Sequence, residues 1–483
     1  MKKYVTKLLL LVFLFTSFTA AAQETSEKGL YHYVLDNGLE LFVMENHAAP
    51  LAYIEIAIRA GGISQSEKNA GLFHLYEHMM FKGNTKYKTA AAVQRALKNL
   101  GVASWNGSTA NEFINYFFTV PSSSLTEGLE FWSYAVRDPL LDPNELENEK
   151  KVVISEISAY HSNPNWILNS AVFSTIFSDE PWKLDPGGNN DIVASATVED
   201  LVNIKNSFYI PNNAALFVGG DVNPDDVFKK VKKIYGSWEK GIDPWEHDTT
   251  VNSTIDKTIY LVQPHPQVSP QIAQVMAYYR GPDITRDKES TYAADMWSAF
   301  VNAPAGRFEQ SLIANPSFAI PNADYLSTGY LTSRHHSIIQ FTAIMLSPEQ
   351  MMGQRAAYFA QVLSDEIALQ IVEEPDFFSE SDYKDHPIGP RDSQILRAQR
   401  PESYMQNIRY WWAVADTEYY FTHDKLTDSM TQKEISQFSS SYLLKKPAVV
   451  VVLINPDLYA QQKSDYDALG YKEITSDSAF WWK

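Results

Sequence analysis

Residues 71–81 read GLFHLYEHMMF, the most specific pattern in the chain. The pattern predicts a helix over residues 69–82, and on a helix His74 and His78 project from one face, one turn apart. Two such imidazoles can bind one metal ion, and Glu77 lies beside them, within reach of a water at the metal. Apolar residues fill most other positions, so the helix is expected to be buried. Burying two His and a Glu is energetically unfavourable unless these side chains bind a partner such as a metal ion. The competing interpretation is a surface helix on which the pattern arose by chance.

A third metal ligand must come from elsewhere, because zinc in a catalytic site takes three protein ligands and keeps one open position. The helix expected from Asn144 to about Tyr160 supplies four candidates: Glu145, Glu147, Glu149 and Glu156. Glu149 and Glu156 lie two helical turns apart and share a face. Glu156 stands among apolar residues and is interpreted as a buried acid that needs a partner, whereas Glu145 and Glu147 are interpreted as solvent-facing charges near the helix N-terminus. The alternative is that Glu149 and Glu156 are ordinary exposed acids.

Helical and strand-like segments alternate on both sides of an aperiodic stretch, residues 246–257. This stretch is predicted to link an N-terminal domain, residues 24–245, to a C-terminal domain, residues 258–483. Residues 208–225 combine a Tyr, a Pro, an apolar strand and Asn-Pro-Asp, and residues 441–457 repeat that order with nearly the same spacing. We therefore predict an α+β protein of two similar halves. Chance similarity of one strand–turn unit is the alternative.

The first 22 residues have the pattern of a secretory signal peptide. Three Lys precede residue 8, residues 8–18 are apolar, and residues 20–22 are all Ala. The apolar run is short for a bilayer, and no later run approaches ~20 apolar residues. We expect an exported mature protein, periplasmic or secreted, without stable membrane insertion. The alternative is a buried N-terminal helix.

Charge and cysteine content exclude several classes of function. The formal net charge is −18, and an acidic surface repels phosphate backbones, so nucleic acid is not an expected partner. The chain contains no Cys, which excludes disulfides, thiolate metal ligands and a Cys nucleophile. The protein must therefore be stabilised by burial of its core, which its length of 483 residues permits.

Further motifs accompany the His-x-x-Glu-His segment. Residues 78–84 read HMMFKGN, residues 149–157 read EKKVVISEI, residues 106–109 read NGST and residues 209–213 read YIPNN. With these motifs the chain resembles the pitrilysin/insulinase family of zinc metallopeptidases, the inverted zincins, which includes the mitochondrial processing peptidase subunits. It is most similar to short, exported bacterial members of that family. The run between the second His and the third ligand is about one residue longer than is usual there.

The resemblance implies a zinc-dependent endopeptidase that hydrolyses peptides or unfolded protein segments. It implies one zinc ion per chain, bound by His74, His78 and Glu156. Glu77 would be the general base that takes a proton from water at the metal, and Glu149 would orient a ligand. A non-catalytic assembly or binding subunit that keeps the fold is the alternative, and the intact Glu77 argues against it.

The resemblance also implies a fold and a partner. Each half would be an α/β-roll, an antiparallel-rich sheet covered by helices, and the two homologous halves would form half of a clamshell chamber. Asn106 would contact the substrate backbone, while neighbouring strand residues pair with the peptide. The second half has no metal motif, and residues 315–319 stand where an Arg/Tyr pair would be expected. We therefore expect a heterodimer with a related chain that supplies the Arg and Tyr; a homodimer that uses Tyr330 and Arg334 is the alternative.

Overall fold

The computed structural model describes residues 23–24, 29–102, 104–246, 254–335, 337–385 and 399–481. The predicted signal peptide and residues 247–253 of the predicted linker lie outside these ranges. Within the described ranges, no helix combines the length and the apolar character needed to cross a membrane. Export, signal cleavage and the domain boundaries stay predictions.

Seven strands form the first sheet, in the order β1-β2-β3-β7-β4-β6-β5. They are β1 (Gln23–Glu24), β2 (Leu30–Val34), β3 (Glu40–Glu45), β4 (Leu51–Ile58), β5 (Trp105–Thr109), β6 (Ile114–Pro121) and β7 (Ala214–Gly220). The helices of this half are α1 (Leu72–Met79), α2 (Ala90–Asn99), α3 (Leu125–Arg137), α4 (Pro143–Tyr160), α5 (Pro164–Ile176), α6 (Asn190–Ser195), α7 (Val198–Phe208) and α8 (Pro224–Tyr235). Alternate strand residues such as Leu41, Ile56 and Leu216 point to one face and form a core with helices of the same half.

Six strands form the second sheet, in the order β10-β11-β9-β12-β8-β13. They are β8 (Ile259–Pro264), β9 (Ile272–Arg280), β10 (Leu326–Leu331), β11 (Ile338–Leu346), β12 (Val449–Ile454) and β13 (Lys472–Glu473). The helices of this half are α9 (Ile284–Val301), α10 (Arg307–Ile313), α11 (Met352–Gln361), α12 (Ala368–Glu373), α13 (Glu380–Asp385), α15 (Pro401–Val414), α16 (Thr417–Thr427), α17 (Gln432–Tyr442) and α18 (Pro456–Ala468).

The two sheets share one topology over five strands. In the first sheet β3 is parallel to β7, and β7, β4, β6 and β5 are successive antiparallel neighbours. In the second sheet β8 is parallel to β12, and β12, β9, β11 and β10 are again successive antiparallel neighbours. The repeated residues 208–225 and 441–457 contain equivalent elements, β7 with the start of α8 and β12 with the start of α18. The predicted α+β fold of two similar halves is confirmed.

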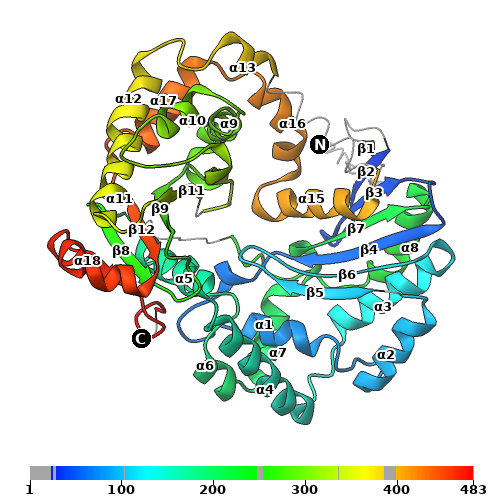
Figure 1. Ribbon diagram of the computed structural model, residues 1–483. Coiled ribbons are helices and arrows are strands. Elements are labelled where there is room, and N and C mark those ends of the chain that lie inside the picture. The colour runs from blue at the N-terminus through cyan, green and yellow to red at the C-terminus, as the bar shows by residue number, and fades with distance from the viewer. Residues whose placement is uncertain are drawn as a thin grey trace, which may run out of the picture.

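Each sheet is covered on its other face by a helix from the opposite half (Figure 1). Helix α15 buries Ile408 against Phe217 of the first sheet, and α5 buries Val172 against Met276 of the second sheet. Separating the two halves would remove α15 from the first sheet and α5 from the second, and would expose an apolar face on each sheet. Burial of these two faces therefore stabilises the association of the halves.

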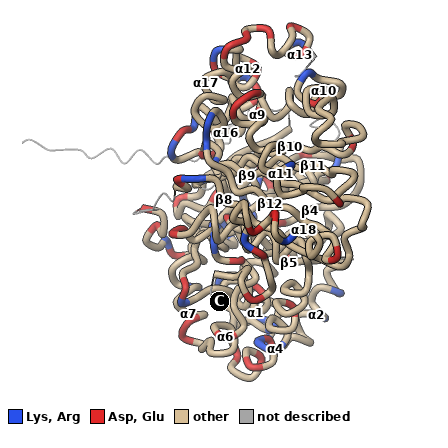
Figure 2. The backbone as a smooth tube through the Cα atoms, turned by 60° about the vertical axis from the view of Figure 1, so that its left-hand side comes forward, with Lys and Arg blue, Asp and Glu red and all other residues tan. Residues whose placement is uncertain are grey.

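Charged residues lie mainly on the helices that surround the two sheets. Figure 2 shows Lys and Arg interspersed with Asp and Glu over these outer elements, while the strands between them carry few charges. The mixture indicates that the net charge of −18 is spread over the surface and chiefly favours solubility.

Candidate active site

Helix α1 carries the His-x-x-Glu-His segment and is shorter at both ends than the predicted 69–82. Its apolar side chains are buried in the core of the first half, which fixes the direction of the two His side chains. Gly71 precedes the helix in the left-handed conformation at φ 93°. A Cβ on Gly71 would lie 2.9 Å from the Cα of Gly188, so the start of the helix is set by the close approach of another chain segment.

Helix α4 packs beside α1 and supplies two carboxylates. Asp142 caps its N-terminus, and Val153 and Ile157 are buried against the core. The buried face sets the rotation of the helix, so that Glu149 and Glu156, two turns apart, both point toward α1.

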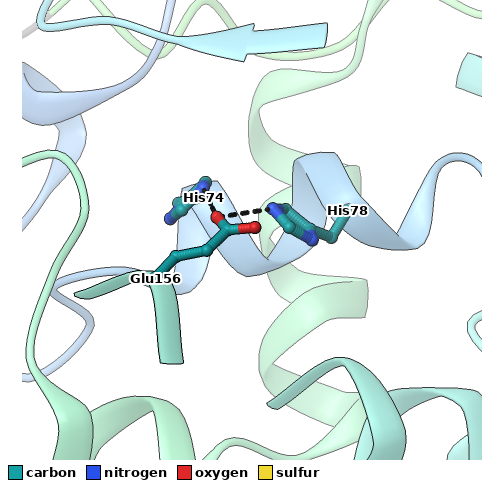
Figure 3. A group of neighbouring side chains, drawn as sticks. All are labelled: His74, His78 and Glu156. Atoms are coloured by element: carbon teal, nitrogen blue, oxygen red, sulfur yellow. Dashed lines mark ion pairs between the residues drawn. The ribbon is translucent and has the colours of Figure 1, made fainter. Parts of the chain in front are cut away.

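Three side chains with metal-ligating groups converge between α1 and α4 (Figure 3). The Nε2 atoms of His74 and His78 lie 3.6 Å and 3.5 Å from the same Oε2 atom of Glu156. One ligand atom from each residue lies within 4.8 Å of the others, and among the residues that the structure describes no second group of His, Cys, Asp or Glu meets this criterion. The structure thus brings together the three residues that the family resemblance implied as ligands.

The interpretation of Glu156 as a buried acid is wrong, and Glu149 is the more buried of the two α4 carboxylates. The Glu156 side chain is 39% exposed, whereas the Glu149 side chain is 8% exposed. The apolar neighbours of Glu156 were misleading because Val152, one turn before it, is itself 43% exposed. Glu156 therefore projects from the helix surface into an open cavity, and Glu149 is the acid that needs buried partners.

Glu149 contacts the far side of His78. Its Oε2 atom lies 3.1 Å from Nδ1 of His78, and its Oε1 atom lies 2.5 Å from Nζ of Lys82. Burial would raise the pKa of Glu149, but hydrogen bonds with His78 and Lys82 outweigh it and hold that pKa below its ordinary value. Burial would likewise lower the pKa of His78, but its hydrogen bond with Glu149 and the charges of Glu77 and Glu156 raise it. The contact at Nδ1 leaves Nε2 of His78 to face Glu156, where it could bind a metal ion.

Glu77 fills the space between α1 and strand β5. Its carboxylate accepts a hydrogen bond from Oγ1 of Thr109 at 3.1 Å. A Cβ on Gly107 would lie 2.6 Å from Oε1 of Glu77, so a residue with a side chain at 107 would displace the carboxylate. Burial raises the pKa of Glu77 to about 7, although the charge of His78 and the Thr109 hydrogen bond oppose the rise. A carboxylate that titrates near neutrality can both accept and release a proton.

Residues 185–188 close the site behind His74. The carboxylate of Asp185 accepts a hydrogen bond from the backbone N–H of Gly187 at 2.7 Å. Burial and the charge of His78 lower the pKa of His74 to about 4, and hydrogen bonding with the Gly187 backbone offsets part of that effect. The lowered pKa favours the neutral imidazole, which is the form that binds metals. The contact with Gly187 joins His74 to a segment more than a hundred residues away, so the residues around His74 could not predict it.

A cavity of about 580 Å³ contains these groups, with His74, His78, Glu156 and Glu77 among its lining residues. Strand β5 forms one side of it and, among the described strands, pairs only with β6. The outer edge of β5 can therefore pair with an extended peptide. Asn106 is exposed on this strand and lines the cavity, a position that suits contact with a substrate backbone.

Tyr330 and Arg334 donate hydrogen bonds to backbone carbonyls of their own chain. The hydroxyl of Tyr330 donates to the carbonyl of Pro282 at 2.7 Å, and Nη2 of Arg334 donates to the carbonyl of Ala413 at 2.8 Å. Burial holds the pKa of Tyr330 well above its ordinary value. This geometry disfavours the homodimer in which the two side chains would act at a second copy of the site.

Relatives with similar sequences match only part of their own length. An uncharacterized zinc protease of Bacillus subtilis, YmfH, is 27% identical over 223 residues, which cover 44% of this chain and 50% of that protein. The beta subunit of the mitochondrial-processing peptidase of Caenorhabditis elegans is 27% identical over 207 residues, which cover 43% of this chain and 44% of that subunit. The chain thus spans about half the length of the curated relatives it matches.

Solved structures show the same fold, and the sequence places the chain in a family. The crystal structure of the first half of the periplasmic protease PqqL from Escherichia coli matches with a TM-score of 0.73 at 18% identity, covering 93% of this chain and 97% of that structure. In whole PqqL, the match covers 51% of the protein. Residues 41–185 match the insulinase domain of peptidase family M16, and residues 195–369 match the domain described as peptidase M16 inactive domain. These two matches together extend over more than half of the chain, which therefore belongs to the insulinase family of peptidases, M16.

Proposed function

We propose that the chain is the zinc-binding part of an endopeptidase that hydrolyses peptides or unfolded protein segments. The observation that carries this proposal is the convergence of His74, His78 and Glu156 in a cavity that also holds the buried carboxylate of Glu77 and the free edge of β5. Family membership supports it, because relatives such as YmfH are named zinc proteases.

The side chains present fit a zinc ion. Ligand atoms bound tetrahedrally at 2.0–2.1 Å lie roughly 3.3 Å apart, and the Nε2 to Oε2 separations here are 3.6 Å for His74 and 3.5 Å for His78. Two imidazoles and one carboxylate are a donor set of catalytic zinc sites, and the half-exposed Glu156 leaves room for a further ligand. When bound, zinc supplies a Lewis acid that polarises a carbonyl and makes water more acidic.

The chain's own residues would position the substrate and transfer the proton. A peptide would pair with β5 as an added strand, with Asn106 against its backbone. Glu77 would take a proton from the attacking water and deliver it to the leaving amine, which a pKa near 7 permits in both directions. Glu149 would hold Nδ1 of His78 and so keep that imidazole oriented.

Elemental analysis for zinc, combined with hydrolysis of a generic fluorogenic peptide, tests the proposal. Zinc at one equivalent per chain and hydrolysis that stops on chelation are the expected results. Peptide binding without hydrolysis in any assembly would favour the non-catalytic subunit. Bound zinc with neither hydrolysis nor peptide binding would indicate a structural metal.

Gly107→Ala is expected to keep zinc but lower kcat/KM by up to about 100-fold. The added Cβ would lie 2.6 Å from Oε1 of Glu77 and push that carboxylate out of place. The matched control is Gly329→Ala, on the equivalent edge strand β10, where an added Cβ meets no heavy atom within 4 Å. Equal activity of the two variants would show that Glu77 does not depend on this contact.

We also propose that the working peptidase contains a second, related chain that closes the chamber and supplies an Arg and a Tyr. The support is that this chain matches about half of whole PqqL and that Tyr330 and Arg334 are engaged internally. Groups that stabilise the developing oxyanion are typically worth about 10²–10³ in rate. The isolated chain is therefore expected to hydrolyse peptides slowly and to gain a rate of that order when its co-purified partner is added. Full activity of the isolated monomer would contradict the partner.

We also propose that the chain is exported from the cytoplasm. The first 22 residues have the pattern of a signal peptide, so the mature chain is expected to begin at Gln23 and to be found in the periplasm or the medium. N-terminal sequencing of the protein from the cells that express it checks this. An intact N-terminus in the cytoplasmic fraction would contradict it.

A further inference from the structure

A second cavity, of about 330 Å³, adjoins the candidate active site. Trp166 and Pro186 line both cavities, so one wall separates them. The inner walls of the second cavity are Phe173, Trp182 and Leu184, of which Trp182 and Leu184 are 5% and 2% exposed. We refer to this second cavity as the Trp166 pocket.

The Trp166 ring of the shared wall stacks on the ring of Tyr160, with centroids 4.6 Å apart and planes 16° from parallel, which favours one orientation of the ring. The two charged residues that line the Trp166 pocket, Lys183 and Asp185, already have partners within the chain. Nζ of Lys183 lies 2.7 Å from the carboxylate of Glu67, and the carboxylate of Asp185 is hydrogen-bonded to the Gly187 backbone and to Trp166. A charged group would gain no new partner from these two residues, whereas an apolar side chain would leave water at little cost.

The free edge of β5 ends at the Trp166 pocket. The backbone carbonyls of the two residues after β5 accept hydrogen bonds from the short helix Gly62–Ser64. The carbonyl of Ala110 accepts from the N–H of Gly62 at 3.1 Å, and that of Asn111 accepts from the N–H of Ile63 at 2.8 Å. Ala110 and Asn111 also line the pocket. A peptide paired with β5 would therefore lose its pairing edge here, and its next side chain would lie at the pocket.

We propose that the Trp166 pocket selects a large apolar or aromatic side chain of the substrate, about three residues from the bond that is cleaved. Gly107 lies beside Glu77 and Ala110 lies at the pocket, and three strand residues span about 10 Å. The cavity is at the lower end of the roughly 300–1,000 Å³ of ligand pockets, which suits one side chain. This specificity rests on the proposed function, because it requires a peptide along β5.

The test uses internally quenched peptides in which one position at a time, up to four residues on either side of the cleaved bond, holds Phe, Leu, Gly or Asp. At one position, about three residues from that bond, Phe and Leu are expected to exceed Gly and Asp by roughly 10- to 100-fold in kcat/KM. Asn169 is exposed on α5 and lines the pocket, so Asn169→Trp fills it and is expected to reduce the Phe/Gly ratio to near one.

Two further variants control for effects on folding. Asn165→Trp makes the same change one helical turn earlier on α5, where the residue is exposed and does not line the pocket, and the Phe/Gly ratio is expected to stay high. Asn169→Ala leaves the pocket open and is also expected to keep the ratio. A Glu77→Gln protein, titrated with the Phe and Gly peptides by fluorescence anisotropy, is expected to show the same preference in Kd without turnover.

The outcomes separate the pocket from the proposed function. The measurements use whichever assembly hydrolyses a generic peptide, the chain alone or with its co-purified partner. Failure to hydrolyse any peptide would overturn the proposed function. Hydrolysis without an apolar preference at the expected distance, or with a preference that survives Asn169→Trp, would overturn the pocket alone.

Discussion

Glu77→Gln is expected to retain one zinc per chain and to lose about 10²–10⁴ in the rate of peptide hydrolysis. The amide has nearly the shape of the carboxylate, so the packing against Gly107 and the contact with Thr109 are preserved. An amide cannot accept the proton of the attacking water, so the chemical step loses its base. The measurement is kcat/KM with a fluorogenic peptide, alongside zinc content by elemental analysis.

The matched control for Glu77→Gln is Glu147→Gln. Glu147 lies on α4 with a 65% exposed side chain that pairs with Lys150, so the same chemical change is made away from the cavity. Zinc content and activity of this control are expected to equal those of the unmodified chain. Peptide hydrolysis at the unmodified rate by Glu77→Gln would move the general base to another residue.

His74→Ala is expected to reduce bound zinc to background and to abolish hydrolysis. The substitution leaves His78 and Glu156, and two ligands do not hold zinc at a site built for three. Zinc that binds only the folded chain raises its Tm, so added zinc is expected to raise the Tm of the unmodified protein and to leave that of His74→Ala unchanged. Elemental analysis and thermal unfolding with and without zinc check both statements.

His265→Ala serves as the control for His74→Ala. His265 follows β8 in the second half, where its Nδ1 atom accepts from the N–H of Gln267 at 3.3 Å, and it is not part of the metal-ligating group. Its zinc content is expected to match that of the unmodified chain. Stoichiometric zinc in His74→Ala would show that the ligand set is different.

Local features of the fold could be predicted because helix and strand periods act over a few residues. The helix expected from Asn144 to about Tyr160 corresponds to α4, Pro143–Tyr160. The predicted repeat of residues 208–225 at 441–457 corresponds to equivalent elements of the two sheets. Helix α1 begins at Leu72 and not at the predicted residue 69, because Gly188, far away in the sequence, packs against Gly71 and sets where the helix begins.

Contacts between distant segments could not be predicted in the same way. The burial of Glu149 and the partial exposure of Glu156 depend on which face of α4 meets α1, whereas the apolar sequence neighbours of Glu156 indicated that it is buried. Lys82 beside Glu149, Gly107 beside Glu77 and the Asp185 loop beside His74 each become visible only when helix, strand and loop are packed together.

The sequence by itself determined that His74, Glu77 and His78 share one side of a helix, because 3.6 residues per turn place them there whatever surrounds the helix. It also determined that the chain contains two similar α+β halves. Only the tertiary structure decided that Glu149 contacts Nδ1 of His78 on the side away from Glu156, and that α5 and α15 each cover the sheet of the opposite half. The physical reason is that these outcomes depend on burying apolar faces formed by segments far apart in the chain, and local periodicity does not specify which faces meet.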